Sequence, residues 1–178
     1  MAIKNPAPYR AIQMPFTRRS RVKSKSYIKT VPPNAIVKFV MGDSRKWNEN
    51  KFPFKVRIFS EENGQVRDVA IEASRQHILR EITNNLGTDF YFAVSVYPHH
   101  MLREHKQAAV AQADRMSTGM TMSFGKTVGR AAQIFKGKPI FTLGFSTDDA
   151  VLRMREIYKQ IRTKIPIDTR LDVIKNKT

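Results

Sequence analysis

The first 30 residues of the chain carry eight basic side chains and no acidic one, which limits how this part can fold. The whole chain has a formal net charge of +17, so about a sixth of its length supplies 8 of those charges. The first carboxylate belongs to Asp43. Such a segment cannot bury enough apolar surface to offset its ordering entropy, and its charges repel one another. We therefore expect residues 1–33 to form an extended basic arm that lies against a polyanion.

RNA is the polyanion that fits this arm best. Tyr9, Phe16 and Tyr27 are interleaved with the basic residues, as expected for side chains that stack on unpaired bases. The sequence has no helix-turn-helix, zinc-finger or basic-zipper pattern, which favours RNA over DNA. The side chains predicted to bind RNA phosphates are Arg10, Arg18, Arg19, Arg21, Lys23, Lys25, Lys136 and Lys138.

The remaining residues, 34–178, are predicted to form a single folded domain. With 41% apolar residues in a chain of 178, there is enough material for a real core. No run of about 18 apolar residues is present, so we expect no membrane span and a soluble, cytoplasmic protein. The absence of cysteine excludes disulfides and cysteine-ligated zinc.

Hydrophobic periodicity places the first elements of this domain. Alternation predicts strands at 36–41, 54–58 and 92–96, with extended chain continuing over 101–106. Lys55 and Arg57 would give the second strand a basic outer face. A helix is predicted over 66–86, and the charged side chains Asp68, Glu72 and Arg75 lie off its apolar stripe. The stretch 43–51 is interpreted as a polar loop whose Trp47 caps the edge of the core.

The second half is predicted to contain a hairpin, a helix and a last strand. Residues 131–135 and 140–145 flank the basic tip Lys136-Gly-Lys-Pro139, the pattern of a hairpin. A helix follows over 146–165, with Ser146 as its cap and Asp149 as the capping-box acid. Residues 171–173 suggest an edge strand. The sequence therefore predicts an α+β fold, an antiparallel or mixed sheet covered on one face by two helices.

Between these elements, residues 107–129 show no stable period and are predicted to form a long glycine-containing loop of functional importance. The spacing Gly119 to Gly125-Lys126 has five residues between its glycines, where a phosphate-binding loop needs four. The cluster His99, His100 and His105 lacks the spacing and helical context of a zinc protease. No nucleophile, base or metal set emerges, so we predict no enzyme, no cofactor and no metal.

The run Ala113-Asp-Arg-Met-Ser-Thr-Gly-Met120, followed by Phe124-Gly-Lys126 and Gly129, resembles the long loop of a universal ribosomal protein family. This is the L-sixteen family of the large subunit, in its archaeal and eukaryotic L-ten-e type. Val96-Tyr-Pro98, Leu102-Arg-Glu104 and the basic arm are similar to the same family, in order along the chain. The resemblance implies a non-enzymatic, monomeric protein of the cytoplasmic ribosome that contacts large-subunit rRNA, 5S rRNA, tRNA and neighbouring ribosomal proteins.

By position, the resemblance also implies a set of loop residues at the tRNA and rRNA interface near the peptidyl-transferase centre. These residues are Arg115, Gly119, Met120, Phe124, Gly125, Lys126, Gly129 and Arg130. The family usually has basic residues after the Gly-Met pair and a proline after Phe-Gly-Lys, whereas this chain has Thr121, Met122 and Thr127. We therefore expect no direct phosphate contact at 121–122.

Three other functions remain open on the sequence alone. A free-standing RNA chaperone or regulator would bind short RNAs without joining a large particle. An architectural DNA-binding protein would bind duplex DNA and structured RNA with comparable affinity. An RNA-modifying enzyme is the weakest of the three, because the sequence offers no catalytic constellation.

Overall fold

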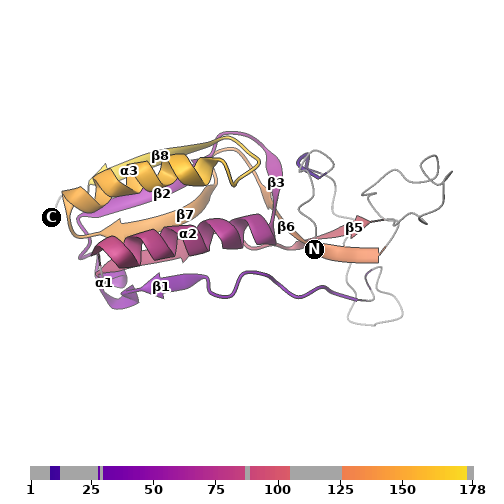
Figure 1. Cartoon of the computed structure of the whole chain (residues 1–178), viewed down its shortest axis with the longest axis horizontal. Helices are drawn as coiled ribbons and strands as arrows, with labels where there is room; N and C mark the ends of the chain where they lie inside the picture. Colours follow the sequence, from indigo (N-terminus) through magenta and orange to yellow (C-terminus); the bar gives the residue numbers. More distant parts are fainter. Residues whose placement is uncertain (1–8, 13–27, 29, 87–88, 105–125, 176–178) are drawn as a thin grey trace.

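The computed structural model describes residues 9–12, 28, 30–86, 89–104 and 126–175, and these form two antiparallel sheets and three helices (Figure 1). The five-stranded sheet has the order β1-β4-β7-β2-β8, and the three-stranded sheet has the order β3-β6-β5. The strands are β1 (Val40–Gly42), β2 (Phe54–Ser60), β3 (Gly64–Arg67), β4 (Phe90–Val94), β5 (His100–Glu104), β6 (Lys126–Ile134), β7 (Pro139–Phe145) and β8 (Thr169–Lys175). The helices are α1 (Ser44–Asn48), α2 (Asp68–Leu86) and α3 (Asp148–Arg162).

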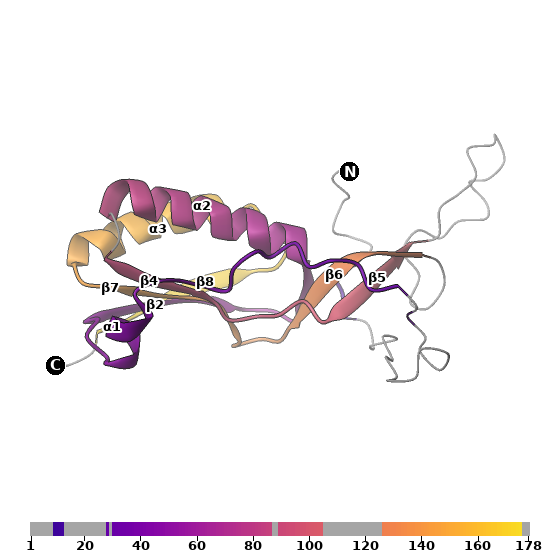
Figure 2. The same cartoon turned by 90° about the horizontal axis from the view of Figure 1, so that it is seen from below.

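Helices α2 and α3 lie side by side on one face of the five-stranded sheet, and α1 lies on the opposite side (Figure 2). The predicted α+β class is confirmed, including the two helices on one face. The last predicted strand is also confirmed, because β8 stands at the edge of this sheet. The opposite face, which α2 and α3 leave uncovered, is called the open face below.

The core forms where apolar stripes of α2 and α3 meet alternating residues of the sheet. The predicted stripe of α3 is buried, with Met154 and Ile161 both at 0% exposure. From the sheet, Val56 and Ile58 of β2 point to the same side and are also fully buried. Each such side chain contributes roughly 1.5–3 kcal/mol on burial, so this layer supplies most of the stability of the domain.

The beginning of α2 differs from the prediction. Residues 64–67 form β3, and the helix begins at Asp68, whose carboxylate accepts hydrogen bonds from the backbone of Ala35 (3.1 Å) and Val69 (2.9 Å). A buried carboxylate at the positive end of the helix dipole is well satisfied there. A strand that runs directly into a helix leaves no turn signal between them, so the helical pattern predicted for 66–86 wrongly includes Val66 and Arg67.

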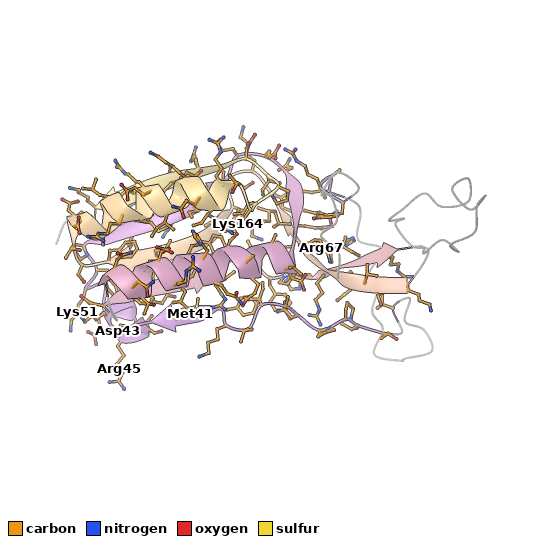
Figure 3. All side chains as sticks on the ribbon, viewed as in Figure 1. Met41, Asp43, Arg45, Lys51, Arg67 and Lys164 are labelled. Atoms are coloured by element: carbon orange, nitrogen blue, oxygen red, sulfur yellow. The ribbon has the colours of Figure 1, made fainter. Side chains whose placement is uncertain are left out.

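Two charged side chains of α2 that were predicted to lie off the buried stripe are themselves buried. Arg75 donates to both carboxylate oxygens of Glu72, at 2.7 and 2.6 Å, and the two side chains are only 7% and 10% exposed. Gln76 donates a further bond to Glu72 (2.8 Å), and Arg75 also contacts the sulfur of Met41 at 3.1 Å. Figure 3 shows Met41 on β1, beside α2. Pairing makes this burial of charge possible.

The first strand and the loop after it also differ from the prediction. The strand expected at 36–41 is short and shifted, since β1 covers Val40–Gly42. The expected loop contains α1, capped by Asp43, whose carboxylate accepts from the backbone of Arg45 (2.9 Å) and Lys46 (3.0 Å). Trp47 packs on the sheet as expected, with its ring stacked on Tyr91 at a centroid distance of 4.3 Å.

In the second half, the predicted hairpin is wrong. β6 pairs with β3 and β5, whereas β7 pairs with β2 and β4, so the two strands belong to different sheets. The predicted cap of α3 is also wrong, because Thr147 occupies the cap position without a side-chain hydrogen bond. Ser146 instead hydrogen-bonds to the carboxylate of Asp89. The bond from Lys46 is the main cause that lowers the pKa of Asp89, and the bond from Ser146 lowers it further.

The three-stranded sheet extends away from the two long helices (Figure 2). Its central strand, β6, begins at Lys126, so residues 126–129, which were predicted to belong to the long loop, are part of a strand. The register between β5 and β6 shifts at Val128, which has no paired residue because Leu102 pairs with Gly129 and Arg103 with Thr127. Such a bulge increases the local twist of a strand pair.

Candidate nucleic-acid interface

Described residues from both regions predicted to meet RNA contact the three-stranded sheet. In the arm, the backbone N–H of Gln65 donates to the carbonyl of Arg10 (2.7 Å), and Thr127 donates to the carbonyl of Thr30 (2.9 Å). In the predicted loop, residues 105–125 connect the paired strands β5 and β6. The predicted arm and the predicted loop therefore leave the folded domain at the same end.

Most of the predicted contact residues in these two regions lie outside the described residues. In the arm these are Arg18, Arg19, Arg21, Lys23 and Lys25. In the loop they are Arg115, Gly119, Met120, Phe124 and Gly125. Their roles stay predictions.

Arg10 is described, and it contacts the domain. Its guanidinium donates to Glu62 in an ion pair whose side chains are 48% and 32% exposed. This bond is the main cause that lowers the pKa of the Glu62 carboxyl, which also accepts from the backbone of Asp168 at 2.9 Å. Gly64 allows the approach of the arm, since a Cβ there would stand 2.5 Å from Ile167 and 3.3 Å from the Arg10 carbonyl. Arg10 therefore ties residues 9–12 to the domain.

Tyr9 does not have the role that the sequence suggested. It is only 6% exposed and packs with Leu102 and Ala131 in a small second core cluster. The guanidinium of Arg67 lies over its ring, 5.7 Å from the centroid, and burial raises the pKa of its hydroxyl. The prediction that Tyr9 stacks on RNA bases is wrong, because its ring is enclosed by protein.

Three of the predicted loop residues lie on β6. Lys126 is exposed at the start of the strand, and Gly129 is buried, with the Arg67 guanidinium 3.4 Å from the place of a Cβ. Arg130 donates to the carbonyl of Pro32 (2.8 Å) and to the hydroxyl of Tyr97 (3.2 Å). Arg130 thus joins the end of the arm to the segment that precedes β5.

Lys136 and Lys138 lie in the turn that connects the two sheets, and both are exposed. The turn is held by Gly137, which has φ +80° and donates to the carbonyl of Ser60 at 2.8 Å. The backbone N–H of Lys136 donates to the side chain of Asn63 at 2.8 Å. The two ammonium groups are therefore presented from a fixed turn, although it is not a hairpin tip.

The basic outer face predicted for β2 is confirmed on the open face. Lys55 and Arg57 alternate with the buried Val56 and Ile58. In the strand register, Arg57 lies opposite Asp172 of β8 and Thr142 of β7. Aromatic rings lie beneath several of these cations. Lys55 stands 5.1 Å from the Trp47 ring centroid, and Arg170 stands 5.7 Å from that of Phe59. Cations held over aromatic rings are partly ordered before any ligand arrives.

Several residues of this interface were not predicted from the sequence. Arg67 lies at the junction of β3 and α2 (Figure 3), within a stretch that was assigned wholly to a helix. The ring of Tyr97 stacks on Phe39 (centroid distance 5.4 Å) and meets the His99 ring in a tilted contact (4.6 Å), a cluster formed by the fold. Phe135 is 54% exposed beside Lys136, and this aromatic–basic neighbour pair is the one signal that the sequence did offer.

The described parts of the chain show neither a metal site nor a membrane-spanning helix. Within these ranges, no group of three or more acidic or histidine side chains is placed to hold a metal ion. None of the helices in the described ranges is both long and apolar enough to cross a membrane.

Comparison with known proteins agrees with this geometry and charge. Residues 13–172 match the family described as ribosomal protein L16p/L10e. The chain is 40% identical to the large ribosomal subunit protein uL16 of Metallosphaera sedula, over 84% of this chain and 85% of the relative. It is 34% identical to uL16 of Nanoarchaeum equitans (96% and 92% covered) and 36% identical to uL16 of Methanococcus maripaludis (99% and 97%). The chain therefore belongs to the ribosomal protein L16p/L10e family.

Proposed function

We propose that this protein is a structural, non-enzymatic constituent of the large ribosomal subunit, in the cytoplasm. The observation that carries the proposal is the family match over residues 13–172. The net charge of +17 supports it, because a protein packed among rRNA phosphates must neutralise them. The protein would act as a single copy, in contact with rRNA and with neighbouring ribosomal proteins.

Large-subunit rRNA and 5S rRNA are the proposed partners of the arm and of the basic surfaces. In this proposal residues 1–33 form the rRNA-binding arm, and residues 34–178 form the domain that presents it. The contacts of residues 9–12 and 30–32 with the three-stranded sheet support a defined starting point for the arm. Arg18, Arg19, Arg21, Lys23 and Lys25 lie between these two anchored pieces and would pair with phosphates.

The region 105–125 is proposed to reach the tRNA accommodation region and the peptidyl-transferase centre. Its ends are held together by the pairing of Glu104 with Lys126, at the end of β5 and β6 that lies far from the helices (Figure 2). A two-stranded ribbon of this kind supports a loop at a distance from the body. Arg130 would act through the position of the ribbon, because its guanidinium is occupied by Pro32 and Tyr97.

Sedimentation of tagged protein in cell lysate tests the proposal. We expect the protein to co-sediment with large subunits on a sucrose gradient, and to remain with them in moderately high salt. A protein found only in the light fractions, bound to short RNAs, would instead be a free RNA chaperone or regulator. Equal affinity for duplex DNA and structured rRNA fragments would indicate an architectural DNA-binding protein.

A further inference from the structure

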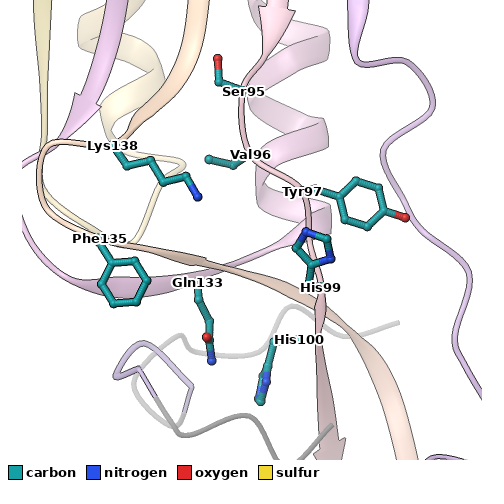
Figure 4. Close-up of a pocket in the computed structure, with 8 residues that line it drawn as sticks. All are labelled: Ser95, Val96, Tyr97, His99, His100, Gln133, Phe135 and Lys138. Carbon is teal, nitrogen blue, oxygen red and sulfur yellow. The ribbon is translucent and has the colours of Figure 1, made fainter. Parts of the chain in front are cut away.

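A cavity of about 340 Å³ lies where the two sheets meet, beside Lys138, one of the residues predicted to bind RNA phosphates (Figure 4). Its wall combines the segment between β4 and β5, the end of β6 and the turn before β7. Its aromatic and polar lining includes Tyr97, His99, His100, Gln133, Phe135 and Lys138. The volume is at the lower end of the roughly 300–1,000 Å³ of small-ligand pockets.

The cavity is lined by two partly exposed aromatic rings. Phe135 is 54% exposed and Tyr97 is 44% exposed. Tyr97 is held in place by stacking on Phe39, by a tilted ring contact with His99 and by the bond from Arg130. The two rings offer apolar surface beside the cavity that a ligand can cover. Planar ligands stack on such rings.

A buried polar group provides the second, independent observation. His100 is only 4% exposed, and its Nδ1 atom has no hydrogen-bond partner. Burial lowers the pKa of this imidazole, so the ring is neutral at pH 7 and has one N–H donor and one acceptor nitrogen. Buried polar groups are nearly always paired, so Nδ1 lacks a partner that a water or a ligand group would supply.

The charge of the cavity selects an anionic ligand. Lys138 is exposed and extends from the turn toward the space between the turn and the segment 95–97 (Figure 4). None of the residues that line the cavity is acidic. Among the described residues no carboxylate pairs with Lys138, so its ammonium group is open to a phosphate.

We propose that this cavity binds one unpaired nucleotide of RNA, extruded from its helix. The base stacks on Phe135, its edge meets the Gln133 amide and the His100 imidazole, and the adjoining phosphate meets Lys138. Sequence-specific recognition of RNA commonly uses bases that are splayed out in this way. The choice of RNA rests on the proposed function, whereas the stacking site rests on the cavity.

Fluorescence of 2-aminopurine tests the proposal with the full chain. The probe is an RNA hairpin with a single bulged 2-aminopurine, and the reference is the same stem without the bulge. We expect the wild-type protein to prefer the bulged hairpin and to quench its fluorescence through stacking. The variant Phe135→Ala should lose about 5- to 150-fold in affinity for the bulged hairpin, and little for the paired one.

Matched variants separate the pocket from general effects. Leu152 is 59% exposed on α3, so Leu152→Ala removes a comparably exposed apolar side chain and should change neither affinity. Lys138→Ala should reduce the salt dependence of binding by about one phosphate contact, while Phe135→Ala leaves that slope unchanged. Because both cavity positions are exposed, these variants are expected to fold.

The outcomes distinguish the pocket from the proposed function. The pocket proposal fails, and the proposed function stands, if the protein joins large subunits but binds the two hairpins with equal affinity. The same conclusion follows if Phe135→Ala lowers the affinity for both hairpins equally. A protein that neither binds the hairpins nor joins large subunits overturns both.

Discussion

Glu104 and Lys126 are paired across β5 and β6, although 21 residues separate them in sequence. The pairing closes the region 105–125 at its base, so both of its ends leave the domain at one point. The same sheet holds residues 9–12 through Gln65 and residues 30–32 through Thr127 and Arg130. One small sheet is therefore the common base of the two regions that distinguish this chain from an ordinary α+β domain.

An engineered disulfide checks this pairing directly, because the chain has no cysteine of its own. Paired residues of antiparallel strands have Cα atoms about 4.5–5.5 Å apart, within the range that a disulfide can span. We expect Glu104→Cys combined with Lys126→Cys to form an intramolecular disulfide on mild oxidation. Non-reducing electrophoresis and mass spectrometry of peptides would detect it.

The matched control is Arg103→Cys combined with Lys126→Cys. Neighbouring residues of a strand point to opposite faces, so this pair should remain largely reduced under the same conditions. Equal oxidation of the two double variants would contradict the register of β5 and β6.

A second prediction concerns the buried ion pair of α2. Glu72→Gln would leave the Arg75 guanidinium buried without its counter-charge, since the two side chains are only 10% and 7% exposed. We expect the free energy of unfolding to fall by about 3–5 kcal/mol. The exposed pair of Arg153 with Asp149 is the control, and Asp149→Asn should cost less than about 1 kcal/mol. Denaturant titration followed by circular dichroism would measure both.

The same pair predicts a pH dependence with a definite sign. The bonds from Arg75 lower the pKa of Glu72 below its ordinary value of 4.5. The stabilisation from this carboxylate is therefore fully present above pH 4.5 and is lost as the pH falls through the lower pKa of the folded state. The stability difference between wild type and Glu72→Gln should be constant from pH 7 to about 5 and should narrow in more acidic buffer. A gap that widens on acidification would contradict the assignment.

Elements with strong local signals were predictable from the sequence. The apolar stripe of α3 at Ala150, Met154, Ile157 and Ile161 is buried as expected, because periodicity depends on neighbours within the helix. The alternation of Val56 and Ile58 with Lys55 and Arg57 predicted both faces of β2 for the same reason. The loop predicted at 107–129 lies mostly outside the described residues, and its last four residues, 126–129, belong to β6.

The failures have non-local causes. Lys136-Gly-Lys has the sequence of a hairpin turn, but the partners of β6 and β7 come from β3, β5, β2 and β4. Glu72 and Arg75 have the sequence pattern of surface charges. In the structure, Met41 and the segment before β1 cover them. Tyr9 looked like an RNA-stacking residue because the sequence does not show that Leu102, Ala131 and Arg67 enclose it.

A third prediction tests how the arm is anchored. Tyr9→Ala removes the largest side chain of the small cluster that holds residues 9–12 against the sheet. We expect faster hydrogen exchange at the Gln65 amide, whose acceptor is the carbonyl of Arg10. The amide of Val56, in the core of the five-stranded sheet, should keep its wild-type rate. Unchanged exchange at Gln65 would show that the backbone bonds alone hold the arm.

The last prediction asks which face of the domain meets RNA. Arg57→Ala with Lys136→Ala removes two positive charges from the open face and the turn beside it. Arg155→Ala with Lys159→Ala removes the same charge from the solvent side of α3. Each lost phosphate contact lowers the slope of log affinity against log salt concentration by about 1. Filter binding to large-subunit rRNA fragments between 50 and 200 mM salt should therefore show a slope lower by about 2 for the first variant and an unchanged slope for the second. A lower slope for Arg155→Ala with Lys159→Ala, and an unchanged slope for Arg57→Ala with Lys136→Ala, would instead place the RNA against the helices α2 and α3.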